Sequence, residues 1–180
     1  MTPSRALFLT GFMGAGKTSV GAALARRRGC AFYDLDALIV ERAGKSVAEI
    51  FATSGETGFR EAESAALRDL LAQLAGGAAV VALGGGSLLS PGNAQAVRAA
   101  GGVVIALDAP LDVLLARTRA ARGTRPLAED EAGFRQLYAA RRPQYLAADV
   151  VVESGSGGVE DVAQQVERSI SALVGDRREK

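Results

Sequence analysis

The sequence predicts an α/β fold with three layers, in which helices cover both faces of a five-stranded parallel sheet. Short apolar stretches typical of strands alternate five times along the chain with stretches typical of helices. The stretch 79–83, Ala-Val-Val-Ala-Leu, is apolar throughout, as expected for a strand buried on both faces. Glycine or aspartate follows most of the predicted strands. Because the carboxyl ends of parallel strands meet at one edge of a sheet, we expect these residues to form one ligand-binding crevice.

The composition is that of an ordinary globular protein and excludes several kinds of chemistry. Of the 180 residues, 48% are hydrophobic and 23% are charged, which fits a single domain over residues 1–180. A net charge of +1 gives no reason to expect a nucleic acid as partner. The sequence has no histidine, which excludes histidine-based catalysis and histidine metal sites. Cys30 is the single cysteine, so there is no disulfide framework.

Nothing in the sequence points to a membrane or to export. No apolar run approaches the ~18–20 residues of a membrane span. A strand begins within six residues of the N-terminus, which leaves no room for a signal peptide. We therefore expect a cytosolic protein, and we expect it to be a monomer.

The first strand, helix and intervening loop predict a phosphate-binding site. Residues 11–18 read Gly-Phe-Met-Gly-Ala-Gly-Lys-Thr and fit the pattern G-x-x-x-x-G-K-[ST]. The apolar stretch 6–10 precedes them, and the Ala- and Leu-rich stretch 19–28 follows as a helix. Glycines in this loop let backbone N–H groups face an anion at the positive end of the helix. We expect Lys17 to reach the phosphates of ATP and the hydroxyl of Thr18 to bind Mg²⁺.

Local signals place the remaining elements in order. The predicted strands are 31–34, 79–83, 103–108 and 150–152. The predicted helices are 37–43, 46–53, 58–74, one that opens at Ser90-Pro91, 110–118, 132–147 and 159–174. Ser46-Val-Ala-Glu49 is a capping box, and Gly55 is expected to break the helical stretch that follows. The polar stretch 119–130 contains Gly123 and Pro126, and we interpret it as a mobile loop.

Two aspartates at the end of the second strand are candidates for metal binding and catalysis. Asp34 and Asp36 alternate along what we expect to be an extended segment, so their side chains should point to opposite sides. One carboxylate can bind Mg²⁺, and the other can take the proton of a substrate hydroxyl. Alternatively, one of them, Asp36 above all, caps the next helix. The strand before Gly84-Gly85-Gly86 lacks the aspartate that often binds Mg²⁺ in such proteins, which favours Asp34 as the metal partner.

Arginines supply nearly all of the positive charge. Arg117, Arg119, Arg122 and Arg125 cluster in and before the polar loop. Such a loop can close over a triphosphate and bring an arginine to the γ-phosphate. Arg60 at a helix start and Arg141 in Arg141-Arg142-Pro143 are further candidates, because arginine forms paired hydrogen bonds with carboxylates and phosphates.

Several short motifs, in this order, make the chain similar to the shikimate kinase family over nearly its full length. The matching pieces are 11–18, Asp34-Leu35-Asp36, Ile50-Phe51-Ala52, Gly55-Glu56, Phe59-Arg60-Glu61-Ala62-Glu63, Leu83-Gly84-Gly85-Gly86, Arg125-Pro126-Leu127 and Arg141-Arg142-Pro143-Gln144-Tyr145. The resemblance implies a P-loop NTPase fold of the nucleoside-monophosphate-kinase type, with a substrate-binding region over about 34–63 and a mobile lid over about 118–130. It also implies transfer of the γ-phosphate of ATP to the 3-hydroxyl of shikimate with Mg²⁺, as a step of aromatic amino-acid biosynthesis.

The resemblance also implies roles for individual residues. Asp36 would bind the shikimate hydroxyls and sit where a base is needed, and Arg60 and Arg141 would clamp the carboxylate. Glu63 would orient Arg60, and Gly85 and Gly86 would line the same pocket. Asp34 and Thr18 would hold Mg²⁺. The residues expected to contact ATP are Gly14, Ala15, Gly16, Lys17, Thr18, Ser19, Arg117, Arg125 and Ser156 of the loop 154–158, with Arg117 on adenine and Arg125, the lid arginine, on the phosphates. Lys17, Asp36 and Arg125 form the expected catalytic set.

Three other functions remain as alternatives. A kinase of the same fold could phosphorylate gluconate or a nucleoside monophosphate. A nucleotide acceptor would need a pocket for its nucleobase, whereas Arg60 with Asp36 suits a hydroxylated carboxylic acid better. A GTP-driven switch would need Asn/Thr-Lys-x-Asp, and none of the three lysines is followed by that aspartate. An inactive ATP-binding module would have lost Lys17, Asp36 or an arginine, and all of these are present.

Overall fold

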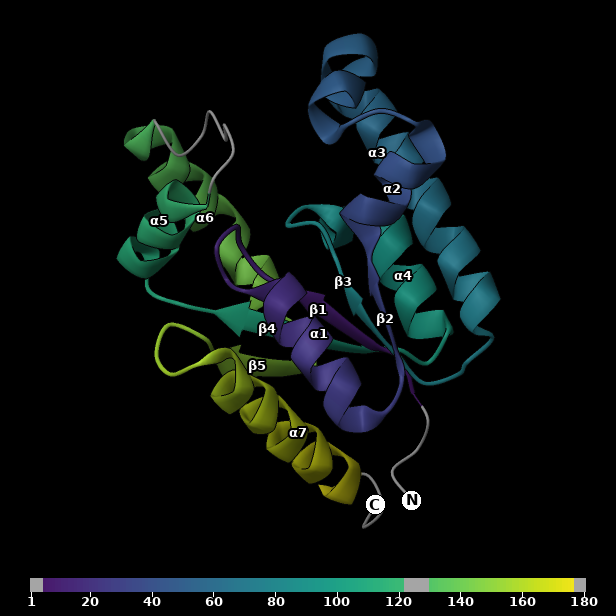
Figure 1. Cartoon of the computed structure of the whole chain (residues 1–180), viewed down its shortest axis with the longest axis vertical. Coiled ribbons are helices and arrows are strands. Elements are labelled where there is room, and N and C mark those ends of the chain that lie inside the picture. The colour runs from purple at the N-terminus through teal and green to yellow at the C-terminus, as the bar shows by residue number, and fades with distance from the viewer. Residues whose placement is uncertain (1–4, 122–129, 177–180) are drawn as a thin grey trace.

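The computed structural model describes residues 5–121 and 130–176. Within these residues five strands form one parallel sheet in the order β2-β3-β1-β4-β5 (Figure 1). The strands are β1 (Leu7–Thr10), β2 (Ala31–Asp34), β3 (Ala79–Ala82), β4 (Val103–Asp108) and β5 (Val150–Glu153). The predicted parallel α/β sheet is therefore confirmed. Since β1 lies at the centre, the loop that follows it opens between β3 and β4, where the strand order reverses.

The helices of the described residues cover both faces of the sheet. They are α1 (Lys17–Arg28), α2 (Leu35–Ala43), α3 (Val47–Leu74), α4 (Pro91–Ala99), α5 (Leu111–Ala120), α6 (Glu131–Tyr145) and α7 (Val159–Asp176), with a short 3₁₀ helix η1 (Ser87–Leu89) that the sequence analysis did not predict. Figure 1 shows α1 and α7 in front of the sheet, with α5 and α6 at the upper left, opposite α2 and the upper part of α3.

The sheet separates two apolar cores because successive residues of a strand point to opposite faces. Along β1, Leu7 and Leu9 pack in one core with α1 and α7. Phe8 lies between them in sequence and packs in the other core with α3 and α4. All of these strand side chains are almost fully buried. The nearly continuous apolar composition of the central strands follows from this burial on both faces.

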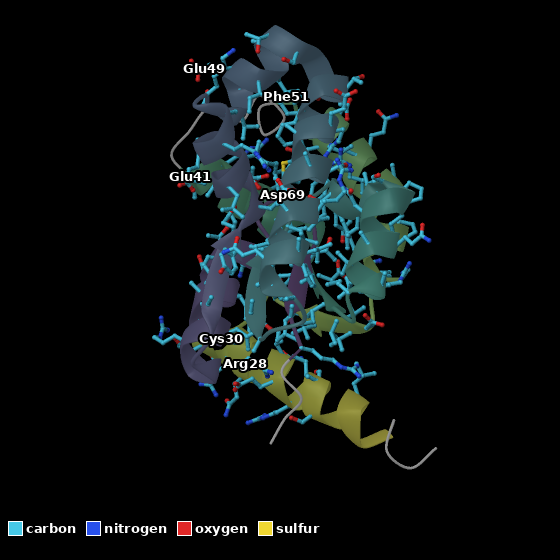
Figure 2. The ribbon with its side chains drawn as sticks, turned by 90° about the vertical axis from the view of Figure 1, so that its right-hand side faces the viewer. Arg28, Cys30, Glu41, Glu49, Phe51 and Asp69 are labelled. Carbon is cyan, nitrogen blue, oxygen red and sulfur yellow. The ribbon has the colours of Figure 1, made fainter. Side chains whose placement is uncertain are left out.

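The long helix α3 forms one wall at the carboxyl end of the sheet. Gly55 interrupts it with φ 67° and ψ −172°, a backbone conformation that a non-glycine residue rarely adopts, so the predicted break is confirmed. The capping box of Ser46 and Glu49 is also present. Beyond the kink, Phe59 is buried and stacks on Phe51, which stands near the top of the molecule in Figure 2, far from Cys30 at the turn after α1.

The start of α2 corrects one expectation from the sequence. The strand β2 ends at Asp34 and the helix begins at once with Leu35, so Asp34 and Asp36 do not alternate along an extended segment. Asp34 itself is the N-cap, and its Oδ1 accepts hydrogen bonds from the backbone N–H groups of Asp36 (3.1 Å) and Ala37 (3.3 Å). The capping role that we considered above all for Asp36 therefore belongs to Asp34.

Three further expectations concern the lid, the end of α5 and the membrane. Most of the predicted lid over 118–130, including Arg122 and Arg125, lies outside the described residues, and its predicted mobility stays a prediction. Helix α5 runs to Ala120, two residues past its predicted end at Thr118. In the part of the chain that the structure describes, no helix is long and apolar enough to cross a membrane.

Candidate active site

The loop between β1 and α1 has the geometry of a phosphate-binding loop. Gly11, Gly14 and Gly16 have positive φ angles of 138°, 83° and 92°. A Cβ atom on Gly14 would lie 2.7 Å from the carbonyl oxygen of Leu114, so a larger residue does not fit where the loop passes α5. Gly16 is the N-cap of α1, and the backbone N–H groups of the first helical turn are directed toward the loop. This arrangement suits an anion such as a phosphate.

The side chain of Lys17 adds a positive charge to the loop. Its ammonium group donates to the carbonyl oxygens of Gly11 (2.8 Å) and Phe12 (3.0 Å). The neighbouring residues predicted to bind the nucleotide differ in exposure, since Ala15 is buried and Ser19 is exposed in the first turn of α1. Their contacts with ATP stay predictions.

Thr18 and Asp34 form a pair of oxygen ligands that fits Mg²⁺. The Thr18 hydroxyl donates to Oδ2 of Asp34 at 2.8 Å. Mg²⁺ binds oxygen, keeps several waters and usually takes one or two protein groups together with substrate phosphates. No cluster of three or more histidine, cysteine, aspartate or glutamate side chains that could hold a metal occurs within the described residues. One hydroxyl and one carboxylate fit a metal whose remaining ligands are waters and nucleotide phosphates.

Asp36 lies across from the glycine segment 84–86, which follows β3. A Cβ atom on Gly84 would lie 3.1 Å from Oδ1 of Asp36, 3.0 Å from Oε1 of Glu63 and 3.1 Å from Oγ of Ser87. Three side-chain oxygens from α2, α3 and η1 thus converge on Gly84. A side chain at that position would crowd these oxygens, which together form a polar surface suited to hydroxyl groups.

Arg60 is held in place by a buried carboxylate. Its Nη1 atom donates to Oε2 of Glu63 at 2.8 Å, and the Glu63 side chain is only 1% exposed. The Ser87 hydroxyl donates to the other oxygen of Glu63 at 2.5 Å. Burial lowers the pKa of Arg60, but the hydrogen bond and charge of Glu63, together with Glu56, outweigh burial and raise this pKa above its ordinary value. The guanidinium group therefore stays charged and oriented.

The glycine segment brings Arg60 close to a second candidate arginine. A Cβ atom on Gly86 would come within 2.5–2.9 Å of the Arg60 guanidinium atoms, so that the group packs directly on bare backbone. Tyr145 is buried and donates to the carbonyl oxygen of Gly85 at 2.5 Å. Burial raises the pKa of Tyr145, whereas the positive charges of Arg141 and Arg60 lower it in part. Both arginines thus lie close to the same phenol.

Arg117 lies on the other side of the phosphate-binding loop, against the loop 154–158. Its guanidinium group donates to the carbonyl oxygens of Ser154 (2.7 Å) and Gly155 (3.4 Å). Glu153 shapes this loop by accepting hydrogen bonds from the N–H of Gly155 and the hydroxyl of Ser156. The Ser156 hydroxyl bond is the main cause that lowers the pKa of Glu153. The structure thus places Arg117 against the loop that contains Ser156.

The sequence analysis missed several residues that organise the site. Ser87 donates a hydrogen bond to Glu63, and Tyr145 donates one to the carbonyl oxygen of Gly85. Arg142 forms a paired salt bridge with Asp108 at the end of β4, with its Nη2 atom 2.6 Å from Oδ2 and its Nε atom 3.3 Å from Oδ1. The signal available in the sequence was the position of Asp108 at a strand end and of Arg142 beside Arg141.

Comparison with known proteins identifies the family. Residues 13–171 match the family model described as shikimate kinase. The shikimate kinase of Geobacter sulfurreducens is 45% identical over 90% of this chain and 88% of its own length. That of Cereibacter sphaeroides is 42% identical over 93% and 83%, respectively.

Solved structures agree with this result. The shikimate kinase from Acinetobacter baumannii in complex with shikimate superimposes with a TM-score of 0.85 at 32% identity, covering 95% of each chain. A gluconokinase from Sinorhizobium meliloti has a TM-score of 0.66 at 19% identity and shares the fold alone. The match to the family model extends from the phosphate-binding loop past helix α6, and the relatives from Geobacter sulfurreducens and Cereibacter sphaeroides are 45% and 42% identical over most of their length. This chain therefore belongs to the shikimate kinase family.

Proposed function

We propose that this chain transfers the γ-phosphate of ATP to the 3-hydroxyl group of shikimate. The observation that carries the proposal is the position of the glycine segment 84–86. A Cβ atom on Gly85 would lie 3.4 Å from the carbonyl oxygen of Gly11 in the phosphate-binding loop, while Gly84 and Gly86 face Asp36 and Arg60. A phosphate donor and a hydroxylated carboxylic acid would therefore meet across this segment.

The residues on the donor side neutralise the charge of the transferred group. The ammonium group of Lys17 and the N–H groups at the start of α1 would bind the phosphates. Bound to Thr18 and Asp34, Mg²⁺ would neutralise charge on the phosphate oxygens. We assign adenine binding to Arg117 and the loop that contains Ser156.

The residues on the acceptor side position the nucleophile. Asp36 would accept the hydrogen bond of the 3-hydroxyl group and take its proton as that oxygen attacks the γ-phosphorus, while ADP leaves. Arg60, fixed by Glu63, and Arg141 would bind the carboxylate of shikimate, and Gly85 and Gly86 would line the pocket. A planar guanidinium group matches a carboxylate in geometry and charge. Arg125 remains a candidate from the sequence for binding the transferred phosphate.

A coupled assay of ADP release with ATP, Mg²⁺ and shikimate tests this proposal. We expect ADP release to require shikimate and to yield shikimate 3-phosphate. Gluconate, the acceptor of a same-fold alternative, serves as the control and should give far slower turnover. Rapid ATP hydrolysis without an acceptor, or equal turnover with gluconate, would contradict the assignment. We further propose that the chain acts as a cytosolic monomer. Sedimentation at the assay concentration would test its oligomeric state.

A further inference from the structure

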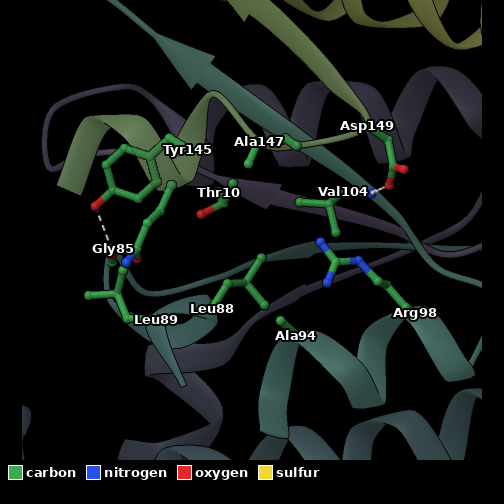
Figure 3. Close-up of a pocket in the computed structure, with 12 residues that line it drawn as sticks. Thr10, Gly85, Leu88, Leu89, Ala94, Arg98, Val104, Tyr145, Ala147 and Asp149 are labelled. Atoms are coloured by element: carbon green, nitrogen blue, oxygen red, sulfur yellow. Dashed lines mark hydrogen bonds between the residues drawn. The ribbon is translucent and has the colours of Figure 1, made fainter. Parts of the chain in front are cut away.

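Tyr145 connects the end of α6 to the glycine segment that lines the acceptor side of the site. It is the last residue of α6, and its side chain is 4% exposed. Its hydroxyl donates to the carbonyl oxygen of Gly85, 60 residues earlier in the chain, as the dashed line in Figure 3 shows. A phenol buried this far commonly takes a polar partner, and here that partner is the backbone of the segment next to Arg60.

Tyr145 also shares its helix with the second candidate arginine, Arg141. Arg141 precedes Tyr145 by one helical turn, so both side chains share one face of α6. The bond from Tyr145 to Gly85 therefore links the helical turn that carries Arg141 to the glycine segment.

The neighbourhood of Gly85 explains why this bond matters. Gly85 and Tyr145 border a cavity of about 60 Å³ that also contacts Leu88, Ala94 and Val104 (Figure 3). Packing on this side is therefore incomplete, so the bond from Tyr145 is an important restraint on Gly85. On the other side, the guanidinium group of Arg60 rests directly on Gly86. A shift of the segment would change the surface against which Arg60 is held.

We propose that Tyr145 is a positioning residue for the acceptor, because its hydroxyl fixes the glycine segment 84–86, and the helical turn that carries Arg141, relative to Arg60. This inference rests on the proposed function, since it assumes that Arg60 and Arg141 bind the carboxylate of shikimate. Tyr145 does not take part in proton or phosphate transfer. Its loss should therefore weaken acceptor binding and leave the chemical step and ATP binding nearly unchanged.

The test compares Tyr145→Phe with Tyr138→Phe. Tyr138 lies on the same helix and also donates to a backbone carbonyl, that of Ala109 at 3.2 Å, but this bond is remote from the glycine segment. Both substitutions remove one hydroxyl and keep the ring. We expect Tyr145→Phe to raise the KM for shikimate about three- to tenfold, the effect of one lost hydrogen bond. The kcat and the KM for ATP should change less than twofold, and Tyr138→Phe should leave the KM for shikimate unchanged.

Direct titration of shikimate in the absence of nucleotide gives a second readout and should show the same loss of affinity. An unchanged KM for shikimate in Tyr145→Phe would overturn the inference, as would equal increases in the KM for shikimate and for ATP. Equal effects of the two variants would also overturn it. The unmodified protein separates these results from failure of the proposed function, because that failure would appear as absent phosphorylation of shikimate before any substitution is made.

Discussion

The hydroxyl of Ser87 offers a sharp test of how the acceptor side is built, through the variant Ser87→Ala. Ser87 is fully buried, and its Oγ donates to Oε1 of Glu63 at 2.5 Å. Alanine removes this donor and changes the volume little, so the carboxylate keeps Arg60 as a partner and loses the bond to its other oxygen. An unsatisfied buried polar atom costs about 1–3 kcal/mol, and more when it is charged. We expect the free energy of unfolding to fall by about 2 kcal/mol.

Urea unfolding followed by circular dichroism measures this loss, and thermal unfolding should show a decrease in Tm of about 4–8 °C for a chain of this size. The matched control is Ser171→Ala, an exposed serine on α7 whose hydroxyl donates to the carbonyl oxygen of Glu167 in its own helix. That substitution should change stability by less than about 0.5 kcal/mol. If Ser87→Ala is no more destabilising than Ser171→Ala, the buried hydrogen bond to Glu63 does not stabilise the fold, and the reasoning is refuted.

Three further predictions concern the proposed proton acceptor Asp36, the proposed carboxylate-binding Arg60 and the helix cap Ser46. Asp36→Asn keeps the shape of the side chain but cannot take a proton, and kcat should fall by about 10²–10⁴ in the coupled assay. Arg60→Lys loses the planar group that Glu63 holds, and affinity for shikimate should fall about ten- to a hundredfold, with ATP affinity unchanged. Ser46→Ala removes the cap that lowers the pKa of Glu49 below 4.5, so its destabilising effect in urea should be larger at pH 7 than at pH 3.

The sign of the last effect follows from proton binding. A carboxyl group whose pKa is lowered by folding stabilises the protein above its unfolded pKa, and this contribution disappears as the pH falls through the folded pKa. A Ser46→Ala effect that grows at low pH would contradict the capping account. A near-normal kcat with a raised KM in Asp36→Asn would leave Asp36 as a positioning residue. Equal loss of ATP and shikimate affinity in Arg60→Lys would move Arg60 to the nucleotide side.

The sequence was most informative where local physics decides the structure. The predicted strand bounds agree with all five described strands to within one residue at either end, most directly for β1, β3 and β4, which are buried along nearly their whole length and therefore apolar. The phosphate-binding loop was predicted as a unit, since its glycines, Lys17 and helix start lie within a few residues. The kink at Gly55 was predicted for the same local reason.

The parts that were missed depend on contacts between distant segments. Nothing periodic in the sequence connects Tyr145 with Gly85, or Arg142 with Asp108, because each pair is formed by the packing of α6 on the carboxyl end of the sheet. The prediction for the start of α2 was wrong for a different reason. We gave strand alternation more weight than the N-capping preference of aspartate, although Asp34 stands directly before the helical stretch.

The two oxygens of Asp34 connect the two halves of the site through one side chain. One accepts the hydroxyl of Thr18 at the start of α1, and the other accepts the backbone N–H of Asp36. A ligand that displaced this carboxylate on the nucleotide side would also disturb the backbone bond that holds the start of α2, where Asp36 lies on the acceptor side. Thermodynamic linkage would make such a coupling reciprocal: if ATP changes the affinity for shikimate, shikimate changes the affinity for ATP by the same factor. Asp34 is thus the side chain through which the two substrate sites would communicate.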